Sequence, residues 1–173
     1  MLISTSRKPS SKTRAFCKNL SHALDCTYVN RGKMSMRELQ LKSTEIGFDS
    51  IALVYEMKGN PSKITFFSNE AKELLVLIGS VNTTKERLNI KTDEITFKSD
   101  LSEFNILKNI FPIDKNSNID STNKENLIYV EKIEEKYNKD IEDYNKRIAI
   151  IHFYNKFGKD TGLKINVRKI IIN

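Results

Sequence analysis

Cationic side chains are the candidate functional groups in this sequence, and their excess over acidic side chains is confined to the first 37 residues. That segment holds eight lysines and arginines and a single acid, Asp25, so its net charge equals the +7 of the whole chain. The rest of the chain is charge-balanced. Lysine and arginine that neutralise phosphates release condensed counterions, and a concentrated basic footprint is typical of polyanion binders. The pattern predicts RNA contacts by Arg7, Lys8, Lys12, Arg14, Lys18, Arg31, Lys33 and Arg37.

Two local elements must position the first group of cations. A short strand over residues 2–5 is broken before Pro9, and apolar residues then recur at helical spacing from residue 11 to 24. The exposed side of this helix carries Arg14, Lys18 and His22, opposite the apolar stripe. Arg7 and Lys8 precede the helix, whose free N–H groups can accept a phosphate.

A second strand and helix position the other group. The strand over residues 28–30 leads into the turn Arg31-Gly32-Lys33, where the glycine permits close approach of the backbone to a ligand. Ser35 and Glu38 have the spacing of a capping box, which predicts a helix from about residue 36 to 44. Tyr28 could stack on a base, although a tyrosine in a strand is more often part of a core.

The remainder of the chain indicates a mixed α/β protein with further strands and one or two helices. Residues 72–80 fit either a strand or a helix, residues 101–111 show a helical face, and residues 112–126 are predicted to be a mobile surface loop. The other expected strands cover residues 50–57, 63–67, 92–98, 127–133, 147–153 and 164–171. We expect one domain over residues 1–173, with two halves of about 1–88 and 89–173.

Composition excludes several classes of protein. A chain with 39% hydrophobic and 29% charged residues is neither disordered nor fibrous. Its apolar runs are too short to span a bilayer, and its polar start does not resemble a signal peptide. Cys17 and Cys26 cannot form a disulfide framework and are poorly spaced for zinc. We therefore expect a cytoplasmic protein that does not enter membranes.

The two basic motifs resemble those of the Brix domain, above all its single-domain archaeal members. The resemblance rests on the Thr5-Ser6-Arg7-Lys8-Pro9-Ser10 motif, Thr13-Arg14, Phe16 and Leu20, and on Asn30-Arg31-Gly32-Lys33-Met34-Ser35 with Glu38-Leu39. The turn Gly59-Asn60-Pro61 also fits. About 60 residues match well, and the C-terminal Gly-Pro-Arg element of eukaryotic members is replaced by a weaker segment over residues 162–168.

The resemblance implies a factor in ribosome biogenesis that binds ribosomal RNA precursors or associated RNA, together with possible assembly proteins. It also implies two structurally similar α/β halves, each like the anticodon-binding domain of class II aminoacyl-tRNA synthetases. It implies no cofactor.

Other functions remain open on the sequence. A protein–protein adaptor would use the same basic face against an acidic partner, and a nuclease would need clustered carboxylates or a histidine pair. We expect that the protein is not an enzyme and that it binds neither a cofactor nor a metal ion, because the two histidines are far apart and no acidic cluster accompanies the basic segment. His152 lies in an apolar strand and is expected to have a packing role. A DNA-binding protein is disfavoured because no helix-turn-helix spacing is visible.

Overall fold

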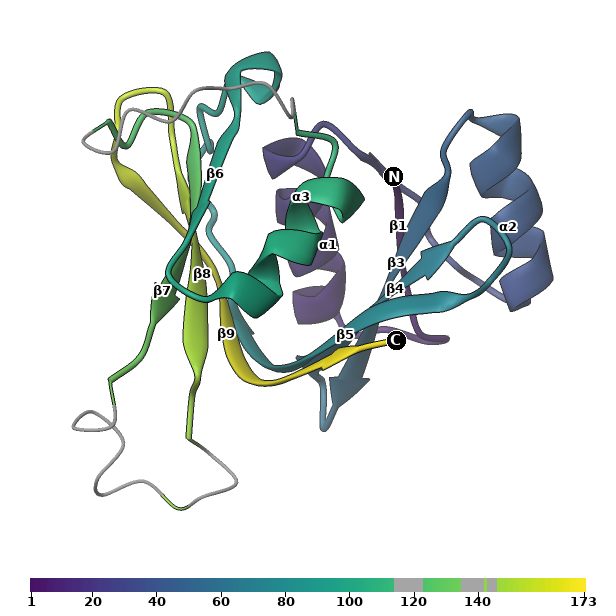
Figure 1. The fold of residues 1–173 in the computed structure, drawn as a ribbon. Coiled ribbons are helices and arrows are strands. Elements are labelled where there is room, and N and C mark those ends of the chain that lie inside the picture. Colours follow the sequence, from purple (N-terminus) through teal and green to yellow (C-terminus); the bar gives the residue numbers. More distant parts are fainter. Residues whose placement is uncertain (114–122, 135–141, 143–145) are drawn as a thin grey trace.

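The computed structural model describes residues 1–113, 123–134, 142 and 146–173. Its nine described strands are β1 (Leu2–Thr5), β2 (Thr27–Tyr28), β3 (Ser50–Met57), β4 (Asn60–Ser68), β5 (Glu73–Asn82), β6 (Thr96–Ser99), β7 (Leu127–Lys132), β8 (Ala149–Tyr154) and β9 (Asp160–Ile172). They form one sheet in the order β2-β1-β3-β4-β5-β9-β8-β7-β6 (Figure 1). Parallel and antiparallel pairs both occur in it, so the predicted α/β class with a mixed sheet is confirmed.

Few helices accompany this sheet: α1 (Ser11–Ala23), α2 (Met36–Glu45) and the short α3 (Leu107–Ile110). The first two confirm the expected helices. The expected helix over residues 101–111 is instead a 3-10 turn, Ser102–Ile106, followed by one turn of α3. It ends at Phe111 because the residue before a proline, here Pro112, is driven into an extended conformation. Most of the predicted mobile loop over residues 112–126 lies outside the described residues.

The segment over residues 72–80, which fits either a strand or a helix by its pattern, is a strand. It pairs with β4 on one side and β9 on the other, and it is therefore a central strand of the sheet. The expected strand over residues 92–98 starts later, at Thr96, after a 3-10 turn at Thr92–Glu94.

Helices α1 and α2 lie on opposite faces of the sheet (Figure 1). Phe16 and Leu20 of α1 pack in one core with Ile3, whereas Leu39 of α2 packs in a second core with Leu2. Successive residues of β1 point to opposite faces, so each helix covers one of them. The strand order explains this arrangement, because the connections from β1 to β2 and from β2 to β3 run in opposite directions and right-handed crossovers then place their helices on opposite faces.

The larger core continues from α1 to α3 and joins the two ends of the sheet. Leu107 and Ile110 of α3 are buried in the same cluster as the α1 residues. Phe66 of β4 and Phe111, which follows α3, meet edge to face with ring centroids 5.9 Å apart. This contact ties the first half of the chain to the second through apolar packing.

Strands β5 and β9 run antiparallel through the middle of the sheet and connect its two groups of strands. The first group pairs β1 parallel to β3, then β4 and β5 antiparallel; the second pairs β6 parallel to β7, then β8 and β9 antiparallel. At the junction, Gly79 lies so close to β9 that an added Cβ would stand 1.8 Å from the carbonyl oxygen of Asn166. A glycine is therefore required there.

Candidate nucleic-acid interface

The structure gathers most of the predicted cations at the edge of the sheet where the parallel strands β1 and β2 end. Because β1 pairs in parallel with both β2 and β3, the loops that follow these strands lie at the same edge. Both α1 and α2 begin there. The strand order reverses at β1, and ligands of open α/β sheets bind outside the carboxyl ends of strands at such a switch point. We define this surface as the basic edge: Arg7, Lys8, Lys12, Arg14, Arg31, Lys33 and Arg37.

Six of these seven side chains are exposed, and Arg31 is half-buried. Lys12 donates to the side-chain oxygen of Asn60, 2.7 Å away, which links α1 to the β3–β4 turn. Lys8 adopts a left-handed backbone conformation with φ of 54°, as does Gly32, with φ of 54°. The open space around Gly32 leaves the backbone of the second turn accessible.

Arg31, one of the predicted RNA contacts, is half-buried. Its guanidinium donates to the carbonyl oxygen of Met34 at 3.0 Å and to that of Thr5 at 3.5 Å. Burial lowers the pKa of this guanidinium, and the neighbouring Arg7 lowers it further. The side chain therefore holds the loop after β2 against the end of β1, and it can offer only part of its donor set to a ligand.

An acid lies beside the N-terminus of α1, where the sequence suggests a phosphate site. The carboxylate of Glu56, at the end of β3, accepts hydrogen bonds from the Ser10 backbone amide and the Thr13 hydroxyl. These bonds lower the pKa of Glu56. Ser10 is the N-cap and its hydroxyl oxygen accepts the Thr13 amide.

The start of α2 follows the sequence prediction. Ser35 and Glu38 form the capping box reciprocally, with the Glu38 carboxylate 2.7 Å from the Ser35 amide and the Ser35 hydroxyl 3.2 Å from the Glu38 amide. The bond from the Ser35 amide lowers the pKa of Glu38. Arg37 lies exposed in the first turn of this helix, so the basic edge extends around the sheet toward the α2 face.

Lys18 lies outside the basic edge, further along α1. It is exposed together with His22, which confirms the basic stripe expected on this helix.

Tyr28 packs against the larger core and its hydroxyl is buried, so its ring is part of the core and is not a free surface for stacking on a base. Burial raises the pKa of that hydroxyl.

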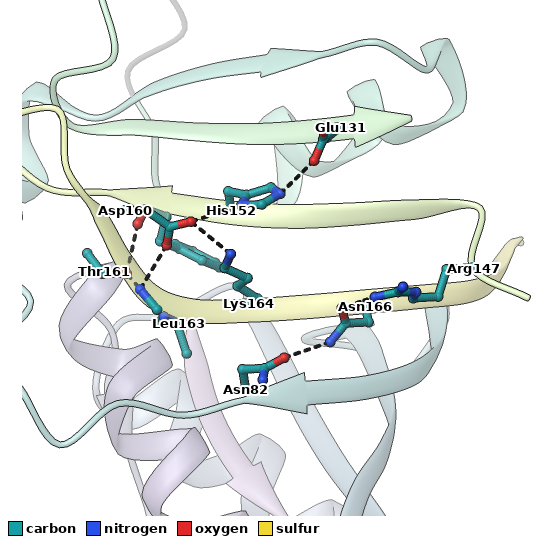
Figure 2. Close-up of polar contacts among 11 residues, drawn as sticks. Asn82, Glu131, Arg147, His152, Asp160, Thr161, Leu163, Lys164 and Asn166 are labelled. Atoms are coloured by element: carbon teal, nitrogen blue, oxygen red, sulfur yellow. Dashed lines mark hydrogen bonds and ion pairs between the residues drawn. The ribbon is translucent and has the colours of Figure 1, made fainter. Parts of the chain in front are cut away.

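A polar network on β7, β8 and β9 was not expected from the sequence (Figure 2). His152 is 8% exposed, and its two ring nitrogens face carboxylates: Nε2 lies 3.0 Å from Glu131 and Nδ1 lies 3.3 Å from Asp160. Lys164 also pairs with Asp160, at 2.9 Å. Burial alone would raise the pKa of Asp160, but hydrogen bonds from Lys164, the Gly162 amide and His152 outweigh it and lower that pKa.

The same face carries a second group of polar contacts beside the junction of the two strand groups. The Asn166 amide donates to the side-chain oxygen of Asn82 at 2.9 Å, and Arg147 donates to Asn166 at 3.4 Å (Figure 2). His152, which was expected to have a packing role, instead links three neighbouring strands through its two hydrogen bonds, to Glu131 on β7 and Asp160 on β9. The two polar residues of β8, His152 and Tyr154, are two positions apart, and this spacing was the signal that could have placed both on one face of the sheet.

Burial disfavours ionisation of both cysteine thiols. Burial raises the pKa of the Cys17 thiol to about 12 and that of Cys26 to about 11. In the described ranges, no group of three or more His, Cys, Asp or Glu side chains is placed so that it could hold a metal ion. Within the same ranges, every helix is too short or too polar to cross a membrane.

Comparisons with known proteins bear on the identity of the chain. No protein-family model matches it. A protein of Methanothermobacter thermautotrophicus named "Probable Brix domain-containing ribosomal biogenesis protein" is 42% identical over 73 residues, which cover 42% of this chain and 44% of the relative. A protein of Methanosarcina mazei with the same name is 46% identical over 74 residues, covering 43% of this chain and 45% of the relative. The matched region spans about half the length of the curated relatives or less.

Solved structures match over the whole chain. The crystal structure of an archaeal Imp4-like protein superposes with a TM-score of 0.79 and 23% identity, covering 100% of this chain and 99% of that one. A probable ribosomal biogenesis protein from Aeropyrum pernix K1 gives a TM-score of 0.66 and 23% identity, covering 99% and 98%. At this identity the structures show a shared fold, and the curated relatives confirm the resemblance to Brix-domain proteins.

Proposed function

We propose that this chain is a non-catalytic RNA-binding factor in ribosome biogenesis, and that the basic edge binds ribosomal RNA or its precursor. The names of the relatives support the role in ribosome biogenesis. The single observation that supports RNA binding by the basic edge is that six exposed cations, from two loops and two helices, lie at the same edge of the sheet. Phosphate groups spaced along an RNA strand match such a row of cations.

The side chains of the basic edge divide into two roles in this proposal. The exposed cations of the two loops contact phosphates: Arg7, Lys8 and Lys33. Arg31 instead fixes the shape of the basic edge, because its guanidinium donates hydrogen bonds to backbone carbonyl oxygens. Lys12, Arg14 and Arg37 follow on the first turns of the helices, and Lys18 continues the surface along α1. Glu38 and Glu56 lie among these cations, and each accepts hydrogen bonds from a helix start.

We also propose that the chain is one domain over residues 1–173, built from two structurally similar halves that meet near residue 88. The repeated pairing order of β1, β3, β4, β5 and β6, β7, β8, β9 supports this division. We further propose that each half resembles the anticodon-binding domain of class II aminoacyl-tRNA synthetases. The proposal also includes a cytoplasmic location and association with assembly proteins.

The experiment that tests the RNA contact compares two matched variants of the full chain. Lys12→Glu/Lys33→Glu removes two exposed cations of the basic edge, and Lys42→Glu/Lys72→Glu makes the same charge change at two exposed lysines away from it. Binding of a labelled ribosomal RNA fragment is measured by fluorescence anisotropy over a salt series. We expect the first pair to weaken binding and to reduce the salt slope by about 0.7 to 0.9 per lost phosphate contact.

The control pair should bind nearly as the native protein does. Equal loss of affinity in both variants would show that net charge and not the basic edge determines binding. No salt-dependent binding by the native protein would overturn the proposed function.

A further inference from the structure

A second cationic surface lies at the far end of α1, where the helix meets the segment that connects β5 to β6. There the structure has a cleft of about 330 Å³, lined by Asn19, His22, residues 86–91 and Lys156. A volume of this size is at the lower end of the range for small-molecule sites, about 300–1,000 Å³. Arg87, Lys91 and Lys156 are separated from the basic segment along the chain, and they have no part in the proposed function of the basic edge.

The walls of the cleft are held by contacts between three distant parts of the chain. The Thr84 amide donates to the side-chain oxygen of Asn19 at 3.0 Å, which fixes the connecting segment to α1. The Lys156 amide donates to the Asn89 carbonyl at 2.9 Å, which fixes it to the β8–β9 turn. Leu88 is buried in the core between these two points. The cleft is therefore formed before any ligand binds.

The charges around the cleft favour an anion. Lys91 is paired with Glu94 at 3.1 Å, and the acid Glu86 also lines the cleft. In the described part of the chain, the Arg87 side chain makes neither a hydrogen bond nor an ion pair, and Lys156 forms no ion pair. These two cations outnumber Glu86, and arginine offers a planar fork that fits a phosphate.

An exposed aromatic ring, that of Phe157, lies beside one of these cations, Lys156. Phe157 is 70% exposed, although large apolar side chains are normally buried, and the Lys156 ammonium lies 5.0 Å from its ring centroid. A solvent-exposed ring next to a phosphate-binding cation is the arrangement on which proteins stack the bases of single-stranded nucleic acids.

The cleft is also continuous with the surface already assigned to RNA. Arg14, Lys18 and His22 follow one another along the exposed side of α1, and His22 lines the cleft. From Arg14 to His22 the helix rises about 12 Å. A strand that leaves the basic edge along α1 therefore reaches the cleft within a few nucleotides.

We propose that this cleft binds one nucleotide of a single-stranded segment of the same RNA, with its phosphate at Arg87 and Lys156 and its base on Phe157. The inference rests on the proposed function. The cleft would hold an unpaired nucleotide, whereas the basic edge contacts the backbone alone, so the protein would favour RNA in which a single strand adjoins a folded region.

The test uses three variants of the full chain and a labelled single-stranded oligouridylate. We expect Arg87→Glu/Lys156→Glu to weaken binding and to make the salt slope less steep by about 0.7 per lost phosphate contact. Phe157→Ala should lower the affinity by about fivefold or more without changing that slope, because base stacking is not ionic. Lys42→Glu/Lys72→Glu serves as the control for charge.

A second measurement separates RNA from free nucleotides. Uridine 5′-monophosphate and inorganic phosphate are titrated into the ¹⁵N-labelled protein, and the amide signals of residues 86–91 and Lys156 are followed. If these signals move with uridine 5′-monophosphate while Arg87→Glu/Lys156→Glu binds oligouridylate normally, the cleft is a site for free nucleotides and the inference is overturned.

The outcomes also separate the inference from the proposed function. Native affinity and salt slope in both Arg87→Glu/Lys156→Glu and Phe157→Ala would overturn the inference and leave the basic edge as the RNA site. Absence of RNA binding by the native protein would overturn both. Loss of affinity in both variants, with a native response in the control, would support the inference.

Discussion

The carboxylate of Glu56 lies 2.9 Å from the backbone amide of Ser10, so an acid at the end of β3 closes the N-terminus of α1. This bond joins the start of α1 to the end of β3, beside cations of the basic edge. It satisfies a donor that a helix start leaves open, and it places a negative charge where the sequence alone suggests a phosphate. The basic edge is therefore built around an acid with a structural role.

Removal of this charge should have opposite effects on RNA binding and on stability. Glu56→Gln keeps the shape of the side chain and removes a repulsive charge, so we expect tighter RNA binding at low salt and a smaller free energy of unfolding. The affinity is measured by anisotropy and the stability by urea denaturation. Weaker RNA binding in Glu56→Gln would argue against phosphate contacts at the basic edge.

The stability effect should depend on pH. Hydrogen bonds from Thr13 and Ser10 lower the pKa of Glu56 from its ordinary value of 4.5. A carboxyl with a lowered pKa contributes its stability above the unfolded value and loses it as the pH falls through the folded value. The difference in free energy of unfolding between the native protein and Glu56→Gln should therefore be constant near neutral pH and shrink below about pH 5. A difference that grows in acid would contradict this account.

Arg31 and Arg14 should respond differently to the same charge reversal. Arg31→Glu removes two hydrogen bonds to carbonyl oxygens and places a carboxylate against them, so we expect a loss of about 1–3 kcal/mol in urea denaturation. Arg14 is exposed, and Arg14→Glu should change stability by less than about 1 kcal/mol while it weakens RNA binding. Equal stability of the two variants would show that Arg31 does not hold the loop.

Gly79 should be intolerant of any side chain. In Gly79→Ala the new Cβ would meet the Asn166 carbonyl oxygen at 1.8 Å, so β5 and β9 must separate. Overpacking of this kind costs about 1–3 kcal/mol, or more where backbone must move. Gly32→Ala is the control: it has open space and should lose only about 1–2 kcal/mol, from its left-handed backbone. Thermal unfolding of both variants measures the difference.

His152 should contribute to stability through both ring nitrogens. His152→Leu keeps an apolar fill but leaves Glu131 and Asp160 without this partner, and we expect a loss of about 1–3 kcal/mol. His152→Gln retains a donor and should lose less. RNA binding should stay native in both, because the residue lies on β8, away from the basic edge. Full stability of His152→Leu would show that the network contributes nothing.

Local features were predictable because they depend on residue spacing along one element. The two faces of α1 follow from the 3.6-residue period, and the capping box at Ser35 and Glu38 follows from a fixed offset of three residues. The surplus charge of residues 1–37 is likewise a property of the sequence, and it singles out the eight cations as candidates without placing them on one surface.

Only the tertiary structure decided how these elements meet. Arg7 and Arg31 share an edge because β1 pairs in parallel with β2, and Glu56 reaches Ser10 because β3 pairs with β1; neither contact has a signal in local spacing. The cleft likewise joins α1, the segment between β5 and β6, and the β8–β9 turn. Residues this far apart in the chain come together through strand order and register, which depend on the burial of the whole sheet and not on any single segment.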